Sequence, residues 1–483
     1  MAVLLAAFIT LLMLLAGAMA QASEGLRIES LKRCGDLLDT RRQDWCLTVR
    51  GLSAQPPTLK LGDKTIPSSA VVREADRLRL RLDSSERQSG PLWLEHGTRT
   101  SNAVWLTLRN SHVLAAGPDE VARNMDGLTT YVNLVSLLIE ERHDGRQEAE
   151  RLAGKYGANV VGSIAPLNLY QLRLPARNLE QRDALVLRLS SEASVDAVVI
   201  EESAPEQAEQ ERPHTPPRDS DEWAANRFLD AVDFYQRRLP GKQAVIQPQP
   251  LRIGLIERDV DFDSPDFADY LGAGGFEVIV ERNSDAGITA NIAASVNLVE
   301  DGVRVLNWSW GIHRVGTRNA EGEEVDSLLR SGLAMSGYEE LLEEFFLWLR
   351  KSHPDVLVVN SAGNGSTFAG TDDYRLPSSF ITEQLLVVGG HQRAQGGERA
   401  VDDPAFAVRR SSSNMDMRVD ITAAACAHAS TLEAGPPGAV HCGTSYATPM
   451  VTGLVAAMLS INPNLQPEQV RMLLRRSAMS IAR

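Results

Sequence analysis

The sequence predicts an α/β protein in three parts: a parallel α/β domain preceded by a ferredoxin-like α+β domain and an N-terminal β-sandwich. Residues 21–117 consist of short runs in which apolar and polar residues alternate, which is typical of antiparallel strands. Residues 128–203 follow the order β-α-β-β-α-β. Residues 224–483 alternate apolar strands with amphipathic helices, which indicates a parallel sheet covered by helices.

Composition and net charge exclude some classes of function. The 483 residues are 43% hydrophobic and 23% charged, values typical of globular domains. The net charge of −14 argues against a nucleic-acid partner, because phosphates are bound by basic surfaces. The sequence shows no clear cluster of metal ligands, so we expect neither a metal nor another cofactor.

Residues 1–20 form an apolar run that ends in the small-residue pattern Ala-Met-Ala. This pattern predicts a signal peptide that is removed before Gln21, and a secreted or periplasmic protein. Because no Lys or Arg precedes the run, an uncleaved N-terminal anchor is the alternative. A membrane is therefore a partner only if this segment is retained.

Four cysteines fall into two close pairs, Cys34 with Cys46 and Cys426 with Cys442. Export to an oxidising compartment would allow both pairs to form disulfides. Their spacings match neither a zinc site nor a Cys-x-x-Cys redox motif. We therefore predict two structural disulfides.

Local patterns predict the elements of the first two domains. In the β-sandwich, runs such as 77–82 and 104–108 alternate strictly and are separated by turn residues, so the domain resembles in outline the immunoglobulin-like modules of secreted proteins. In the α+β domain we expect a strand at 132–139, a helix at 147–156, strands at 160–164 and 169–174, a helix at 179–192 and a strand at 195–201.

Residues 204–223 form a proline-rich and acidic linker with almost no apolar side chains, which we expect to be exposed. The C-terminal domain is expected to contain strands at 251–256, 303–309, 356–360 and 385–390, and helices at 292–300 and 338–351. Loops that follow parallel strands meet at one edge of the sheet, where functional sites form.

Residues 443–453 carry the pattern Gly-Thr-Ser-x-Ala-x-Pro-x-Val-x-Gly, and the apolar run 454–459 follows at once. This order places the Ser445 hydroxyl at a helix N-terminus, where backbone N–H groups favour developing negative charge. The pattern resembles the nucleophile segment of the subtilisin-like serine peptidases, the subtilases. The resemblance implies a subtilisin-like fold, action on peptide bonds, and Ser445 as the nucleophile.

Other segments resemble the subtilase pattern in the same order along the chain. Residues 361–365, Ser-Ala-Gly-Asn-Gly, resemble the segment whose asparagine binds the oxyanion, which implies that role for Asn364. Residues 306–311, Leu-Asn-Trp-Ser-Trp-Gly, resemble the strand that lines the substrate cleft. The resemblance thus implies four substrate-binding residues: Ser309, Trp310, Gly311 and Gly363.

The α+β domain directly precedes the linker and the subtilase-like domain. In that position it resembles the inhibitory propeptide of the family. The resemblance implies that this domain assists folding, lays its tail in the substrate cleft, and is released by cleavage in the linker. A generic ferredoxin-like module explains the same pattern of elements equally well.

The acidic member of the expected triad is altered. When the chain is aligned with the family on residues 265–266, Pro-Asp, Glu257 falls where the aspartate belongs. A glutamate is one methylene longer and could still orient an imidazole. Asp259 and Asp261 are alternatives, although each is more typical of a polar loop.

The histidine is missing from its expected place. No histidine occurs between Asp266 and Ser309, where the family carries its catalytic histidine. Either Asp285 takes that position or the whole helix is absent, and we prefer the second interpretation because 292–300 matches the next helix of the fold. Histidines elsewhere are interpreted as ordinary surface residues or, in the case of His96-Gly-Thr, as a chance motif: His96, His313, His391, His428 and His441.

Two functions are therefore expected. The first is a serine endopeptidase that uses Ser445, Asn364 and Glu257 with an unidentified base. The second is a pseudopeptidase that binds a peptide or a partner protein without cutting it. Loss of the triad histidine costs about 10⁶-fold in kcat, and the oxyanion hole with binding retains only about 10³-fold over water, so weak or absent activity is favoured. A serine–carboxylate site of Ser445, Asp285 and Glu257, as in the sedolisins, is a third arrangement.

Overall fold

The computed structural model divides into two compact units, Met1–Leu108 and Arg109–Arg483. The predicted signal peptide, the linker, Asp259, Asp261 and Asp285 lie outside the residues that the structure describes. The described residues are 26–52, 55–75, 77–203, 250–257, 276–282, 287–313, 317–318, 324–326, 331–365, 375–394, 399, 403–415, 418–428 and 440–479.

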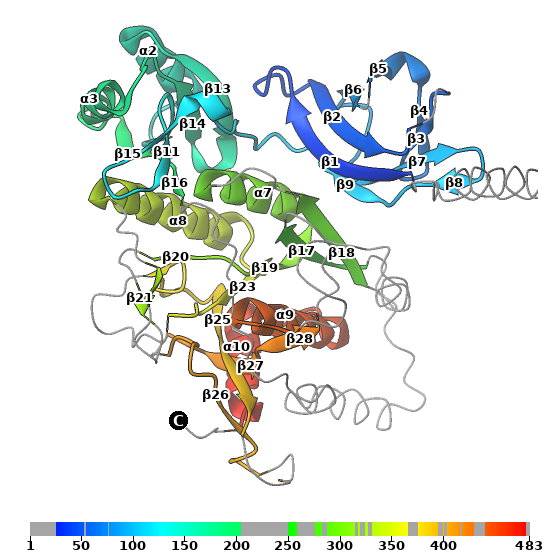
Figure 1. Cartoon of the computed structure of the whole chain (residues 1–483), viewed down its shortest axis with the longest axis vertical. Helices are drawn as coiled ribbons and strands as arrows, with labels where there is room; N and C mark the ends of the chain where they lie inside the picture. Colours follow the sequence, from blue (N-terminus) through cyan, green and yellow to red (C-terminus); the bar gives the residue numbers. More distant parts are fainter. Residues whose placement is uncertain are drawn as a thin grey trace, which may run out of the picture. The chain divides into compact units, whose positions relative to one another are not determined.

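The first unit consists of short antiparallel strands (Figure 1). Their bounds are β1 (Arg27–Cys34), β2 (Arg42–Arg50), β3 (Thr58–Leu61), β4 (Lys64–Ile66), β5 (Val71–Glu74), β6 (Arg77–Asp83), β7 (Gly90–His96), β8 (Arg99–Thr100) and β9 (Val104–Leu106), with a 3₁₀ turn η1 (Ser68–Ala70). One sheet has the order β1-β2-β6-β5 and the other β4-β3-β7-β8, with β9 paired to β7.

Alternation along these strands builds a single core between the two sheets. Leu78, Leu80 and Leu82 of β6 are buried and belong to the same apolar cluster as Leu92 and Leu94 of β7. Side chains that alternate along a strand point to opposite faces, so one face of each sheet supplies the core. The predicted β-sandwich is confirmed, and a disulfide joins Cys34 of β1 to Cys46 of β2 as predicted.

The α+β domain has the predicted order of elements. Its bounds are η2 (Pro118–Glu120), β10 (Val121–Arg123), β11 (Thr129–Tyr131), β12 (Leu134–Ile139), α2 (Gly145–Tyr156), β13 (Asn159–Ile164), η3 (Ala165–Leu167), β14 (Leu169–Arg173), α3 (Leu179–Leu189), β15 (Val195–Val199) and β16 (Glu202–Ser203). The main sheet has the order β13-β14-β12-β15, and every neighbouring pair is antiparallel. The predicted ferredoxin-like topology is confirmed.

Both helices of this domain begin at side-chain caps. Asp144 Oδ1 accepts a hydrogen bond from Gln147 N at 3.0 Å, and Asn178 Oδ1 accepts one from Gln181 N at 2.9 Å. Each bond satisfies a backbone donor that the first turn of a helix leaves free. Helix α2 ends at Gly157, whose φ of +67° is a conformation that glycine adopts without strain.

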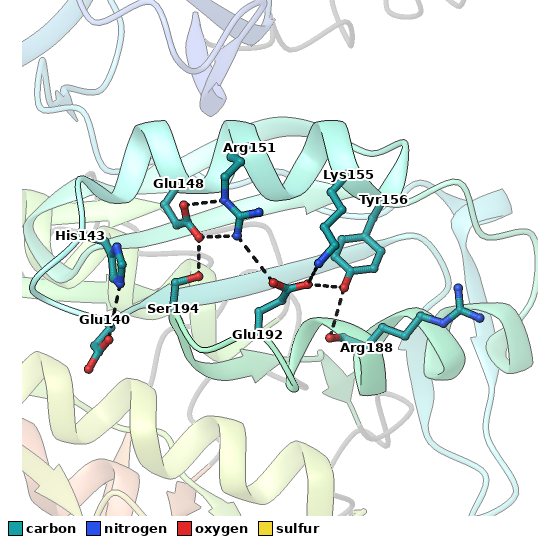
Figure 2. A network of polar contacts seen from close by, with 9 residues as sticks. All are labelled: Glu140, His143, Glu148, Arg151, Lys155, Tyr156, Arg188, Glu192 and Ser194. Atoms are coloured by element: carbon teal, nitrogen blue, oxygen red, sulfur yellow. Dashed lines mark hydrogen bonds and ion pairs between the residues drawn. The ribbon is translucent and has the colours of Figure 1, made fainter.

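A surface network of charges joins α2 to the segment between α3 and β15 (Figure 2). The Arg151 guanidinium bonds Glu148 and reaches Glu192 at 3.6 Å. Glu192 also accepts hydrogen bonds from Lys155 and from the Tyr156 hydroxyl. Exposed ion pairs of this kind each contribute little to the free energy of folding. The network therefore adds to the packing of α2 and does not create it.

The C-terminal domain is built on a mostly parallel sheet with the order β18-β17-β19-β23-β25-β26, in which β27 also pairs with β25. The bounds are β17 (Leu251–Glu257), β18 (Phe276–Arg282), α7 (Ile288–Glu300), β19 (Val303–Trp308), β20 (Ile312–His313), β21 (Thr317–Arg318), β22 (Glu324–Asp326), α8 (Gly332–Ser352), β23 (Leu357–Ser361), β24 (Arg375–Leu376), β25 (Leu385–Arg393), β26 (Ala407–Arg409), β27 (Ile421–Ala424), β28 (Cys426–His428), β29 (Val440–Cys442), α9 (Thr444–Ile461) and α10 (Pro467–Ser477).

The predicted helices at 292–300 and 338–351 are both present but begin earlier, because capping groups extend them. Ser331 Oγ accepts a hydrogen bond from Ala334 N at 3.1 Å, which starts α8 at Gly332. The second predicted disulfide is also present and joins Cys426 to Cys442 across the β28–β29 pair.

Helices cover both faces of the sheet. On one face, Trp308 of β19 is fully buried against Phe345 and Phe346 of α8. On the other face, α9 packs Val455 against the strands in a cluster that includes Val305. Helix α9 is long and apolar enough to cross a membrane by composition, but its buried face in this cluster makes it a core helix. The expected α/β architecture, a mostly parallel sheet with helices on both faces, is confirmed.

The α+β domain is joined to α7 by a carboxylate at its C-terminal end. The Glu201 carboxylate accepts hydrogen bonds from Ile288 N at 3.1 Å and from Thr289 N at 2.9 Å. A Cβ placed on Gly287 would lie 2.7 Å from that carboxylate, so the approach requires glycine. Glu201 therefore caps the N-terminus of a helix that follows it by almost ninety residues.

The next residue makes the same type of contact with α8. The Glu202 carboxylate accepts from Ser331 N at 3.1 Å and from Ser331 Oγ at 2.9 Å, and Glu202 N donates to the Tyr338 hydroxyl at 2.7 Å. Gly337 lets α8 approach β15 closely, since a Cβ there would lie 2.8 Å from Val198 O. Two adjacent glutamates thus fix the α+β domain to two helices of the C-terminal domain.

The segment that leads into the α+β domain is held along α7. Asn297 Nδ2 donates to Ser111 O at 2.8 Å, and Asn297 Oδ1 accepts from Ser111 N at 3.1 Å. Arg109 Nε forms an ion pair with Asp301 at 2.6 Å. Contacts with α7 or its C-terminal cap are therefore made by Glu201 at one end of the domain and by the segment that precedes the domain.

Candidate active site

Helix α9 places Ser445 where the sequence predicted it. The helix begins at Thr444, so Ser445 lies in its first turn. The Ser445 hydroxyl donates a hydrogen bond to the Ser309 carbonyl at 3.1 Å, and the Ser309 hydroxyl donates to the Ser445 carbonyl at the same distance. The structure thus brings the predicted nucleophile into contact with a residue predicted to bind substrate.

Asn364 lies beside the turn that leads into α9. Its Oδ1 accepts hydrogen bonds from Thr444 N at 2.8 Å and from Thr444 Oγ1 at 3.2 Å. Gly363 N donates to Thr444 Oγ1 at 3.0 Å, and the φ of +101° at Gly363 favours glycine there. These bonds fix the orientation of the amide, with Nδ2 close to Gly443, where an added Cβ would lie 3.1 Å away.

Ser309, Gly311, Gly363, Asn364 and Ser445 are referred to below as the Ser445 site. Its five residues follow the carboxyl ends of β19 and β23 or begin α9. Because β19 and β23 are neighbouring parallel strands, their following loops meet at one edge of the sheet, as the sequence predicted. Trp310, the remaining residue predicted to bind substrate, packs against Trp308 with ring centroids 4.8 Å apart.

Two buried asparagines that the sequence reasoning missed hold this edge of the sheet. Asn360 Nδ2 donates to Trp308 O at 2.9 Å and to Trp310 O at 2.8 Å. Asn307 Nδ2 donates to Ser309 Oγ at 2.9 Å, and its Oδ1 accepts from the Thr452 hydroxyl of α9 at 2.9 Å. Asparagine within an otherwise apolar strand was the available signal, since buried amides are retained where they have partners.

Arg375 of β24 is a further residue that the sequence reasoning missed. Its guanidinium donates to the Ser361 carbonyl, to the Ser361 hydroxyl at 3.1 Å and to the Ser378 hydroxyl at 3.1 Å. Burial lowers the pKa of Arg375 to about 9. No local pattern marks this residue, which lies outside the recognised motifs at 361–365 and 443–453.

The acid–base side of the site is less complete among the described residues. Glu257 ends β17 at the expected edge of the sheet, and its side chain lies outside what the structure describes. The same holds for the side chains of His313, His428 and His441. His391 is described, and the expectation of a surface residue is wrong for it: it is buried on β25, and its Nδ1 lies 2.9 Å from Thr422 Oγ1 of β27.

The described partner of the Ser445 hydroxyl is a backbone carbonyl, which cannot remove a proton from it. Within the described ranges, no group of three or more His, Cys, Asp or Glu side chains could hold a metal ion. The described atoms therefore provide a positioned serine and a positioned amide, and they show no group that would activate the serine.

Comparison with known proteins agrees with the motif. Residues 274–482 match the model of the subtilase family, Peptidase S8. The match begins after β17, so Glu257 lies outside it. No curated protein matches the chain.

Several solved structures are similar to the chain at low identity. One is the epidermin leader peptide processing serine protease (EpiP) from Staphylococcus aureus, at 16% identity and a TM-score of 0.45, with 71% of this chain and 91% of that chain covered. A second is a lanthipeptide protease, at 18% identity and a TM-score of 0.37, with 54% and 87% covered. A third is a cold adapted subtilisin-like serine proteinase, at 18% identity and a TM-score of 0.32, with 50% and 88% covered.

The family match spans the strands and helices that carry Ser309, Asn364 and Ser445. The motif at 443–453 lies within it, at the start of α9. Residues 274–482, which make up less than half of the chain, are therefore similar to the subtilase family.

Proposed function

We propose that this protein binds peptide segments at the Ser445 site and does not hydrolyse them at a useful rate. The observation that carries the proposal is the hydrogen bond from the Ser445 hydroxyl to the Ser309 carbonyl. It is supported by the sequence, which has no histidine between Asp266 and Ser309. Without a base the expected rate is about 10⁶-fold below that of a complete triad.

Peptide bond hydrolysis is the second candidate, and the fixed orientation of the Asn364 amide favours it. The amide is fixed by Thr444, which directly precedes Ser445. An amide donor placed for an oxyanion contributes about 10² to 10³-fold to kcat in serine peptidases. Glu257, or Glu257 with Asp285, would be the acidic group of such an enzyme.

Labelling with a fluorophosphonate probe separates the two candidates. We expect no labelling of the full-length protein between pH 4 and pH 9, with a commercial subtilisin as the positive control and Ser445→Ala as the background. Labelling that depends on Ser445 would show an activated nucleophile, because the probe reacts with serines that a base has activated. It would replace the binding proposal by the peptidase.

Cleavage of the chain itself gives an independent measurement. The α+β domain is held at Glu201 and Glu202, directly before the predicted linker at 204–223. Mass spectrometry of the purified protein is expected to find the linker intact in both wild type and Ser445→Ala. A cut linker in wild type that is intact in the variant would demonstrate self-processing.

Peptide binding itself is tested by fluorescence anisotropy with fluorescein-labelled peptides.

We further propose that the protein is exported to the periplasm or the medium. The predicted signal peptide and the two disulfides support this proposal. N-terminal sequencing of protein recovered from a periplasmic fraction checks it, and a mature chain that begins at Gln21 is expected.

A further inference from the structure

Arg375 is a buried cation whose hydrogen-bonding capacity the described residues do not fill. The residue is 7% exposed. Nη1 donates to the Ser361 carbonyl and the Ser378 hydroxyl, and Nη2 donates to the Ser361 hydroxyl. Nε is buried, and none of the described residues accepts a hydrogen bond from it. Since a guanidinium carries five N–H donors, the edge formed by Nε and Nη2 retains capacity for an acceptor.

The described acceptors of Arg375 are all uncharged. They are one backbone carbonyl and two hydroxyls, and no carboxylate within the described ranges forms an ion pair with the guanidinium. With a pKa of about 9 the group is still charged at neutral pH. A buried charge without a counter-charge is costly, so an anion that reached this edge would be bound favourably.

The position of the guanidinium connects it to the Ser445 site. Strand β24 pairs with β20, which directly follows Gly311. A Cβ on Gly311 would lie 2.1 Å from Cζ and from Nη2 of Arg375, and a Cβ on Gly363 would lie 2.7 Å from Nε. The guanidinium therefore lies against both glycines. Gly311 is two residues from Ser309, which contacts Ser445, and Gly363 N itself donates to Thr444 Oγ1.

We propose that Arg375 binds the carboxylate of a peptide held at the Ser445 site, so that the protein selects peptides with an acidic group at that position. The inference rests on the proposed peptide binding. Two N–H groups on one edge of a guanidinium match the two oxygens of a carboxylate, which gives both affinity and orientation. An amide of the same shape accepts one such bond and leaves the charge uncompensated.

The carboxylate could belong to an Asp or Glu side chain or to the peptide C-terminus, and peptide design separates the two sources. Three fluorescein-labelled, alanine-rich octapeptides are titrated with full-length protein: an amidated peptide with one central Glu, its amidated Gln counterpart, and the Gln peptide with a free C-terminal acid. We expect at least one acid-bearing peptide to bind about tenfold or more tightly than the amidated Gln peptide. The Glu peptide identifies a side-chain site, and the free acid identifies a C-terminal site.

Variants of Arg375 test whether this residue causes the preference for acid-bearing peptides. In Arg375→Met the preference for the acidic peptide is expected to fall to within about twofold, while Arg375→Lys keeps part of it through charge alone. Circular dichroism checks that each variant is folded. If Arg375→Met does not fold, the comparison of the peptides on wild type still decides the proposal.

Asp372→Asn combined with Asp373→Asn is the matched control, because these are the acidic residues nearest to Arg375 in the sequence. We expect the control to keep the wild-type preference. A preference that arises only in the control would mean that the chain's own aspartates neutralise Arg375, and it would overturn the proposal.

The remaining outcomes separate this inference from the proposed function. If all three peptides bind wild type with the same affinity, peptide binding stands and the role of Arg375 is wrong. If none binds, the proposed peptide binding fails and the inference fails with it.

Discussion

Two polar regions of the C-terminal unit are built differently: the contacts that fix the α+β domain, and the Ser445 site. Glu201 and Glu202 each accept two hydrogen bonds from groups at the start of α7 or α8. At the Ser445 site, the described groups fix the serine and Asn364 in place, but the serine donates to a carbonyl and Arg375 Nε has no described acceptor.

This difference in how far the hydrogen-bonding groups are satisfied indicates different roles for the two regions. A carboxylate whose oxygens accept hydrogen bonds from helix N–H groups and a hydroxyl inside the chain stabilises the fold through those bonds, although no counter-charge lies beside it. A buried cation that is not matched among the described residues, placed beside a positioned serine, is typical of a surface that receives a ligand. The comparison therefore supports the proposed binding role of the Ser445 site.

The largest effect is expected from the scaffold of the Ser445 site. Asn360→Ala leaves the Trp308 and Trp310 carbonyls without their donor, and each buried carbonyl costs about 1 to 3 kcal/mol. We expect the free energy of unfolding to fall by about 2 to 4 kcal/mol in urea denaturation. Asn462→Ala, at an exposed helix end, is the control and should change it by less than about 0.5 kcal/mol. Equal effects would mean that Asn360 does not hold this edge.

The attachment of the α+β domain is expected to respond next. Glu202→Ala removes the acceptor of Ser331 N and Ser331 Oγ, which should lower the free energy of unfolding by about 1 to 3 kcal/mol. Hydrogen exchange of the first turn of α8 should become faster in the same variant. Glu180→Ala, an exposed residue in the first turn of α3, is the control. Unchanged exchange in α8 would show that Glu202 does not stabilise that helix.

Glu281 provides a pH-dependent test beside α7. Burial, with a smaller contribution from Asp301, raises the pKa of Glu281 well above its usual value of 4.5, while a hydrogen bond from Asn297 opposes the shift. The native state therefore favours the protonated acid. The contribution of Glu281 to the free energy of unfolding is fully present below pH 4.5 and is lost as pH rises through the raised pKa.

Glu281→Gln removes that dependence. The variant and wild type should have similar stability near pH 4.5, and the variant should become the more stable protein as pH rises towards 8. Urea denaturation across this range measures the difference. A difference that stays constant with pH would contradict the raised pKa.

The smallest effect is expected in the surface network of the α+β domain (Figure 2). Hydrogen bonds from Arg151, and then from Ser194, lower the pKa of Glu148 to about 2. The contribution of Glu148 to the free energy of unfolding is present above the usual pKa of 4.5 and is lost as pH falls towards 2. Glu148→Gln should cost at most about 1 kcal/mol at pH 7, because solvent screens this pair, and almost nothing near pH 2. A larger cost at pH 7 would make the network part of the domain's main stability.

Much of the fold could be predicted because its signals are local. Alternation with a period of two identified the strands 77–82 and 104–108, and the order of elements in 128–203 identified the ferredoxin-like topology. Helix starts were the weakest predictions, since α7 and α8 were extended by groups such as Ser331 and Glu201.

The sequence by itself determined that a serine stands in the first turn of a core helix, that an asparagine follows a buried strand, and that no histidine occurs in 266–309. Short motifs and their order suffice for such statements. Only the tertiary structure decided that Glu201 caps α7, that Asn360 holds the loop after β19, and that Arg375 lies against Gly311 and Gly363. Most of these contacts join segments more than fifty residues apart in the chain, and no local pattern specifies which distant donor or charge a side chain will meet.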